Sequence, residues 1–185
     1  MKRVLLLLFL LPNFTWAKDL AIYNPETIFI SQENLLSFLK KTEDHDKTCE
    51  NERNVKYDLV DLKANKNLRG HLIGEEIRLK LNPILKTYCN FLISKLDENT
   101  EKTSKLNLEI KNFFFKLVDT NYLLGFNKDY DDSDHGYATS ISVVPVLFVY
   151  SHMRNSFEKN EIKQIDEMFK KLVKKNDYVL TKKTG

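Results

Sequence analysis

A histidine and a tyrosine separated by one glycine are the residues of this sequence best suited to acid–base chemistry. His135, Gly136 and Tyr137 follow an acidic run and lead into the most apolar segment beyond residue 17. Imidazole and phenol groups can act as general base and general acid, and functional groups often lie where a loop meets a rigid element. A capping histidine beside a core tyrosine is the alternative interpretation.

Tyr150 and Arg154 are four residues apart in one expected helix, so their side chains share a face. A tyrosine beside an arginine could hold an anionic sugar, and a surface contact between the two is the alternative. We expect His152 to point elsewhere. His71 lies in an undecided segment without a recognisable partner, and it joins Tyr150 as a candidate substrate-binding residue.

Alternating acidic side chains between residues 129 and 134 raise the question of a calcium site, because Ca²⁺ prefers oxygen ligands on a loop. The EF-hand pattern fails here, since Asp134 stands where glycine is required and Ser140 where glutamate is required. A solvated acidic loop is the preferred interpretation. Calcium at Asp129, Asp131 and Asp134 is the alternative, and we expect no other metal or cofactor.

The amino terminus has the order of a secretory signal peptide, with Lys2 and Arg3 before an apolar run that ends at Leu11. This run is shorter than the roughly 18 apolar residues of a membrane span. We expect cleavage after Ala17, export to the periplasm or the medium, and no integral membrane span. No Gly/Pro/Ser-rich linker divides residues 18–185, which predicts a single domain.

Two cysteines, Cys49 and Cys89, remain in the mature chain. An even number of cysteines in an exported protein predicts a disulfide, which would contribute roughly 4 kcal/mol for a loop of this size. Two buried free thiols are the alternative.

The net charge of +3 indicates little about partners, because Lys2 and Arg3 leave with the signal peptide. Lysine is abundant together with Asn, Ile and Phe, a mixture that AT-rich coding also produces, so we expect no nucleic-acid partner. The sequence lacks a phosphate-binding glycine loop, a nucleophile elbow and a paired-histidine metal motif. Nucleotide and metal hydrolase chemistry are therefore disfavoured.

Hydrophobic spacing predicts an all-α fold of antiparallel helical hairpins. A first helix over residues 32–41 follows Ser31, which can cap it. Asn82 is a favoured N-cap, and Pro83 suits the first position of the next helix, which carries Cys89.

The segment over residues 55–81 stays ambiguous between helix and strand, because Ile77, Leu79 and Leu81 alternate with charged residues. A further helix carries apolar residues from Leu106 to Val118. We expect the stretch from Asp119 to Thr139 to be the least regular part of the chain.

The apolar residues within 138–154 leave almost no polar face, which predicts a helix buried on most sides. Pro145 should kink this helix or shift its start. The spacing of apolar residues from Ile162 to Val173 predicts an ordinary amphipathic helix near the carboxyl end.

The stretch from His135 to Ser151, with the apolar positions that follow as far as Asn176, resembles part of the alginate-lyase-like proteins. The resemblance implies an exported, all-helical (α/α) toroid whose cleft binds acidic polysaccharide and cleaves it by β-elimination. The family's Asn-His pair has no counterpart here, and a complete toroid is nearly twice as long. A partial toroid, from a fragment or a reduced relative, is therefore the expected form.

Two functions follow from these observations. The first is binding or β-elimination of an acidic polysaccharide in a cleft beside residues 119–139, where His135 or Tyr137 takes the proton and Arg154 offsets the carboxylate charge. The second is a non-catalytic exported module, such as an inhibitor, immunity or envelope factor, that binds another protein. A broad exposed apolar patch would favour the module, whereas a concave cleft lined by Tyr, His and Arg would favour the glycan site.

Overall fold

The computed structural model of the chain describes residues 31–41, 62–126 and 133–181, without the side chains of 133–138 and 176–181. Within these ranges the fold is all-α, as predicted, and contains no strand. The elements are α2 (Gln32–Lys40), α4 (His71–Leu81), α5 (Pro83–Leu96), α6 (Thr100–Thr120), η4 (Tyr122–Leu124), α7 (Ser133–Met153), η5 (Arg154–Ser156) and α8 (Lys159–Thr181).

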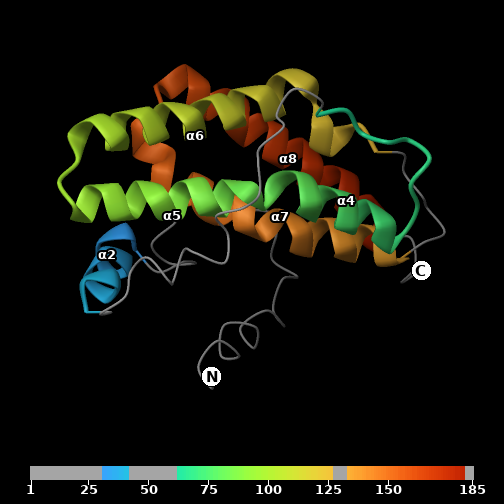
Figure 1. The fold of residues 1–185 in the computed structure, drawn as a ribbon. Coiled ribbons are helices and arrows are strands. Elements are labelled where there is room, and N and C mark those ends of the chain that lie inside the picture. Colours follow the sequence, from blue (N-terminus) through green and yellow to red (C-terminus); the bar gives the residue numbers. More distant parts are fainter. Residues whose placement is uncertain (1–30, 42–61, 127–132, 182–185) are drawn as a thin grey trace.

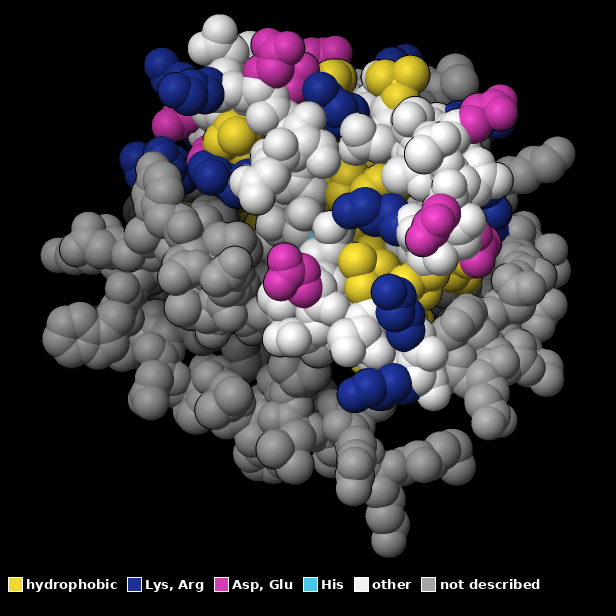
Figure 2. Space-filling model, turned by 90° about the vertical axis from the view of Figure 1, so that its left-hand side faces the viewer, with side chains coloured by type: hydrophobic (Ala, Val, Ile, Leu, Met, Phe, Trp, Pro, Cys, Tyr) yellow, Lys and Arg dark blue, Asp and Glu magenta, His cyan; other side chains and the backbone are white. Residues whose placement is uncertain are grey.

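The helices form a compact bundle (Figure 1), and on the face at the left of that view lysine and arginine side chains lie among apolar ones (Figure 2). α4 and α5 follow one another along one line, and α6 returns antiparallel over α5 after a short turn. α7 lies along α4, which is its most extensive contact, and α8 packs against both α6 and α7. The short turn explains the antiparallel pairing of α5 and α6, because so few residues can only reverse the chain.

Aromatic rings occupy the centre of the core, where α6, α7 and α8 meet. The ring of Phe114 lies 5.4 Å from that of Tyr150 and 5.7 Å from that of Phe157, measured between centroids. Tyr150 in turn lies 5.7 Å from Phe169. Phe114, Tyr150 and Phe169 are each almost fully buried. Their burial removes large apolar areas from water and holds the three helices together.

The first predicted helix is confirmed. α2 begins one residue after Ser31, whose Oγ accepts a hydrogen bond from the backbone N–H of Asn34 at 3.2 Å. This bond satisfies one of the amide donors that the first turn of a helix leaves unpaired.

The ambiguous segment is helical over residues 71–81, and its apparent strand alternation is not a strand pattern. Ile77 and Leu81 are four residues apart and buried, whereas Leu79 is 65% exposed. Burial at every fourth position is the pattern of a helix face.

α5 begins at Pro83 as predicted, but the prediction that Asn82 caps it is wrong. Asn82 has helical backbone angles, with φ −56° and ψ −29°, and its side chain makes no capping bond. A capping residue needs an extended backbone to reach the first turn. The chain passes almost without interruption from α4 to α5, so Asn82 keeps a helical backbone and its Oδ1 is buried without a hydrogen-bond partner.

Where the structure describes the stretch 119–139, at residues 119–126 and 133–139, the chain is more regular than expected. α6 continues to Thr120, residues 122–124 form η4, and α7 starts at Ser133, so His135, Gly136 and Tyr137 lie within helix rather than in a loop. Tyr122 and Leu123 are almost fully buried, which explains why this connection packs onto the core.

The prediction that α7 is buried on most sides is wrong in part. Val143, Val146 and Val149 are buried, but Ile141 is 49% exposed and Val144 is 46% exposed. Pro145 lies inside the helix and does not mark its start. The neighbouring helices leave the side of α7 at Ile141 and Val144 uncovered, whereas Phe148 and His152 further along that side contact Tyr88 of α5.

The start of α8 is held by a carboxylate that binds two donors. Glu161 Oε2 accepts a hydrogen bond from the backbone N–H of Glu158 at 2.7 Å, and it lies 3.1 Å from Lys111 Nζ of α6. The bond to Glu158 is the half of a capping box in which the third residue of the helix reaches back. The hydrogen bond from the backbone of Glu158, and to a smaller extent Lys111, hold the pKa of Glu161 below its ordinary value of 4.5.

We expect the Glu161→Gln variant to lose stability less steeply in acid than the wild-type protein. A carboxylate whose pKa is lowered by folding stabilises the fold above its unfolded pKa, and that contribution disappears as the pH falls through the folded pKa. The measurement is urea unfolding at pH 7 and at several values below pH 4.5. Glu101→Gln, which changes an exposed carboxylate in the first turn of α6, is the matched control and should keep the wild-type dependence. Identical acid profiles for wild type and Glu161→Gln would contradict this account.

We also expect Gly125→Ala to destabilise the fold by roughly 1–3 kcal/mol, because overpacking forces rigid neighbours apart. A Cβ at position 125 would lie 2.8 Å from Cβ of Ala64. Adding Ala64→Gly to the same chain removes the clash, so the double variant should unfold at higher urea than Gly125→Ala alone. A double variant that is no more stable than Gly125→Ala would show that the contact is not the cause.

Candidate functional site

The structure does not bring the three predicted catalytic residues together. His135 and Tyr137 lie in the first turns of α7, and Arg154 follows its last residue. A helix rises about 1.5 Å per residue, so the backbones of Tyr137 and Arg154 are separated by about 25 Å. A proton acceptor at one end of α7 and a guanidinium at the other cannot act on the same sugar ring.

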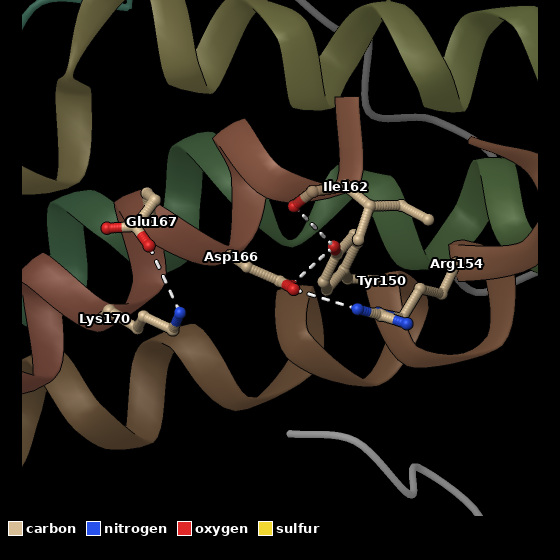
Figure 3. A network of polar contacts seen from close by, with 6 residues as sticks. All are labelled: Tyr150, Arg154, Ile162, Asp166, Glu167 and Lys170. Carbon is tan, nitrogen blue, oxygen red and sulfur yellow. Dashed lines mark hydrogen bonds and ion pairs between the residues drawn. The ribbon is translucent and has the colours of Figure 1, made fainter. Parts of the chain in front are cut away.

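Tyr150 and Arg154 do share a site, together with a residue that the sequence had not indicated (Figure 3). Tyr150 Oη donates a hydrogen bond to Asp166 Oδ1 of α8 at 2.7 Å. Arg154 Nη2 donates to the other carboxylate oxygen, Oδ2, at 2.9 Å. Asp166 is 8% exposed and so belongs to the core of the bundle.

The electrostatics of this cluster are those of a structural contact. Asp166 balances the charge of Arg154, so an anionic ligand would have to compete with a buried carboxylate. Burial, and then the hydrogen bond to Asp166, raise the pKa of the Tyr150 phenol. At neutral pH the phenol therefore keeps its proton, as its role as hydrogen-bond donor requires, and it is not a general base.

A second polar cluster joins α2, α5 and α7. Tyr88 Oη lies 2.7 Å from His152 Nδ1 and accepts a hydrogen bond from Gln32 Nε2 at 3.3 Å. Lys95 Nζ donates to Gln32 Oε1 at 3.1 Å. The phenol oxygen of Tyr88 thus connects Gln32 of α2 with His152 of α7. His152 thus points away from the Tyr150 cluster, as predicted, and towards α5.

The outward face of α7 is the third candidate site. We use this name for Ile141 and Val144, which lie three residues apart on the side opposite the buried valines. Phe148 lies four residues after Val144, and its ring packs against those of Tyr88 and His152 at centroid distances of 6.0 and 4.4 Å, which closes this end of the face. Ile141 and Val144 are exposed and Phe148 is half-buried. The sequence contains no Asp, Glu, Lys or Arg between residues 136 and 151, so the face is uncharged as well as apolar.

The remaining predicted site residues are His71 and the three aspartates of the candidate calcium site. His71 opens α4 with an exposed side chain and takes no part in the Tyr150–Asp166–Arg154 cluster. Asp129 and Asp131 lie outside the described residues, and Asp134 lies in the first turn of α7. Among the described side chains, no group of three or more His, Cys, Asp or Glu residues could hold a metal ion.

Cys89 is half-buried on α5 and is not a free thiol. Cys49 lies outside the described residues. The pairing of Cys49 with Cys89 therefore stays a prediction.

Comparison with known proteins places the chain in no family: no family model, no curated protein and no solved structure matches it. The resemblance to alginate-lyase-like proteins thus stays an expectation from the sequence. None of the described helices combines the length and apolar character needed to span a bilayer.

The contacts of Asp166 predict a graded series of stability losses. We expect Asp166→Ala to lower the free energy of unfolding by roughly 2–4 kcal/mol, because it leaves a buried phenol and a guanidinium without their common acceptor. Tyr150→Phe should cost about 1–2 kcal/mol.

The neighbouring residue on α8 provides the control. Glu167 is exposed and pairs with Lys170 at 3.2 Å on the surface (Figure 3), so Glu167→Ala should cost less than about 0.5 kcal/mol. The three values come from urea unfolding followed by circular dichroism. Equal losses for Asp166→Ala and Glu167→Ala would rule out the buried cluster as a stabilising contact.

Proposed function

We propose that this chain is a non-catalytic, exported helical module that binds another protein through the outward face of α7. The observation that carries the proposal is a pair of exposed aliphatic side chains, Ile141 and Val144, on a helix side with no charged residue for four turns. Export rests on the signal-peptide pattern of residues 1–17.

The composition of this face is that of an interface core. The centres of protein–protein interfaces are depleted in charged residues and rich in apolar and aromatic ones. Ile141 and Val144 lie one turn apart, a spacing by which a helix presents apolar side chains to a partner helix or groove. The partner we propose is accordingly an apolar helix or strand of another exported protein.

A catalytic function has weaker support. β-Elimination on a uronate needs a proton acceptor and a cationic group within reach of one sugar ring. Tyr137 and Arg154 lie at opposite ends of α7, and Arg154 is already paired with Asp166. Binding or cleavage of an acidic polysaccharide is therefore the second candidate, and it rests on the sequence resemblance alone.

A disulfide between Cys49 and Cys89 is part of the proposal. It would hold residues 42–61 to α5 in the oxidising compartments that an exported protein reaches. A small helical module gains stability from such a covalent link without any catalytic role.

The test is photo-crosslinking in the producing cell from a photoreactive side chain at position 144. We expect a discrete adduct between this chain and a second protein, because position 144 lies at the centre of the proposed interface. Ile141→Asp in the same chain should remove the adduct by placing a charge in that interface. A photoreactive side chain at position 163, which is exposed on the polar side of α8, is the matched control and should give no adduct.

Two results would contradict the proposal. One is the same crosslinking pattern from positions 144 and 163, which would indicate non-specific contact. The other is the appearance of unsaturated uronate, seen by ultraviolet absorbance, when the purified protein is incubated with alginate or another polyuronate. That second result would establish a lyase and restore the polysaccharide function.

A further inference from the structure

We infer that the outward side of α8 binds a lipid surface that carries anionic headgroups. The contact is made by four exposed lysines, Lys159, Lys163, Lys171 and Lys174, which we call the α8 lysine row. The row lies on a different helix from the outward face of α7, so this inference goes beyond the proposed protein contact. It rests on how the fold places and pairs the charges of α8.

The four lysines lie along one side of α8. Successive members are four, eight and three residues apart, and such separations keep side chains on the same side of a helix. The row is about 22 Å long, since a helix rises about 1.5 Å per residue. The opposite side of α8 is buried in the bundle through Ile165, Met168, Phe169 and Leu172. The row therefore faces away from the core.

The acidic residues of α8 between 159 and 175 are each paired with a cation outside the row. The pairs, with the distance from carboxylate oxygen to side-chain nitrogen, are Glu161–Lys111 at 3.1 Å, Asp166–Arg154 at 2.9 Å and Glu167–Lys170 at 3.2 Å. Figure 3 shows the last two.

The lysines of the row are left without such a pair. In the part of the chain that the structure describes, no ion pair includes any of the four. Glu167 lies on the same side of α8 as the row, and Lys170 offsets its charge. The row therefore carries four positive charges that no carboxylate of the described structure balances.

This excess of positive charge is local. The whole chain has 29 basic and 26 acidic residues, and Lys2 and Arg3 leave with the predicted signal peptide, so the rest is almost neutral. On α6, by contrast, the exposed Lys105 has Glu101 and Glu109 one turn away on either side. An anionic partner therefore meets an unbalanced positive potential at α8.

Lipid headgroups suit the row better than other polyanions. Single-stranded nucleic acids need aromatic side chains on which bases stack, and Phe169, the only aromatic residue of α8 whose side chain is described, is buried. Arginine binds one phosphate or carboxylate through paired hydrogen bonds, whereas the row contains only lysine, a compact point charge. A straight row on the outer side of a helix is open rather than concave like a sugar-binding pocket. Near a plane of anionic headgroups, each lysine strengthens binding about fivefold.

The experiment is co-sedimentation of the purified mature chain with vesicles of equal parts phosphatidylglycerol and phosphatidylcholine, and with vesicles of phosphatidylcholine alone. We expect binding to the first kind and none to the second. Raising the salt from about 0.1 M to about 1 M should reduce binding roughly tenfold or more, because the screening length falls from about 10 Å to about 3 Å.

Variants of the row test its lysines directly. Lys163→Gln together with Lys174→Gln should weaken vesicle binding about 25-fold, at about fivefold for each lysine. Lys163→Arg together with Lys174→Arg keeps both charges and should keep the binding. The matched control is Lys102→Gln together with Lys105→Gln on α6, which changes the net charge equally and should leave most of the binding. Every side chain changed is exposed, so helical circular dichroism should be the same in all variants.

Four results would overturn the inference. Equal losses from the α6 and α8 glutamine variants would assign the binding to net charge, and equal binding to both kinds of vesicle would indicate apolar insertion. The absence of binding to either vesicle would show the row to be a solvated surface. Binding of soluble alginate that requires Lys163 and Lys174, without binding to vesicles, would identify an acidic polysaccharide as the ligand of the row.

The two proposals fail separately, because the vesicles contain no protein. Since the row contacts lipid in this account, no protein adduct is expected from position 163 in the cell under either proposal. Vesicle binding without an adduct from position 144 would leave only the lipid contact standing. An adduct from position 144 without vesicle binding would leave only the protein contact.

Discussion

The burial of α7 is the constraint on which the rest of the described structure depends. Its sequence has no charged side chain from residue 136 to residue 151, so water is a poor environment for every side of this helix. α4 lies along it, and α5 and α8 complete the cover over Val143, Val146 and Val149. Three neighbours enclose only one side of a helix. Ile141 and Val144 remain at the surface for that reason.

Polar contacts at the carboxyl end of α7 fix how its neighbours are placed. Asp166 joins α8 to Tyr150 and Arg154, and Tyr88 joins α5 to His152. Apolar packing alone tolerates small shifts between helices, whereas hydrogen bonds to buried groups are satisfied in one arrangement. Because the side chains involved are buried or half-buried, a shift of α8 along α7 would leave a carboxylate without its donors.

The same helix that organises the bundle also separates the residues that a catalytic function would need to combine. α7 is a rod with His135 and Tyr137 at its start and Arg154 just past its end. The ends of α7 are therefore too far apart to form one catalytic site.

The sequence by itself determined most of the local structure. Ser31 and Pro83 marked two helix starts, and apolar residues at every third and fourth position identified the buried sides of α5, α6 and α8, because these signals depend on neighbours within one or two turns. The shared face of Tyr150 and Arg154 followed from the same helical spacing. The cap at Asn82 failed because the preceding helix, which the sequence left ambiguous, imposes its own backbone on that residue.

Only the tertiary structure decided which groups meet across helices. Asp166 lies twelve residues after Arg154 and on another helix, so no local pattern indicated that it neutralises the guanidinium. Nor could the apolar composition of α7 indicate which of its sides the neighbours would leave uncovered. Both outcomes depend on how α4, α5 and α8 pack around α7, and that packing is set by the combined shape of side chains far apart in the sequence.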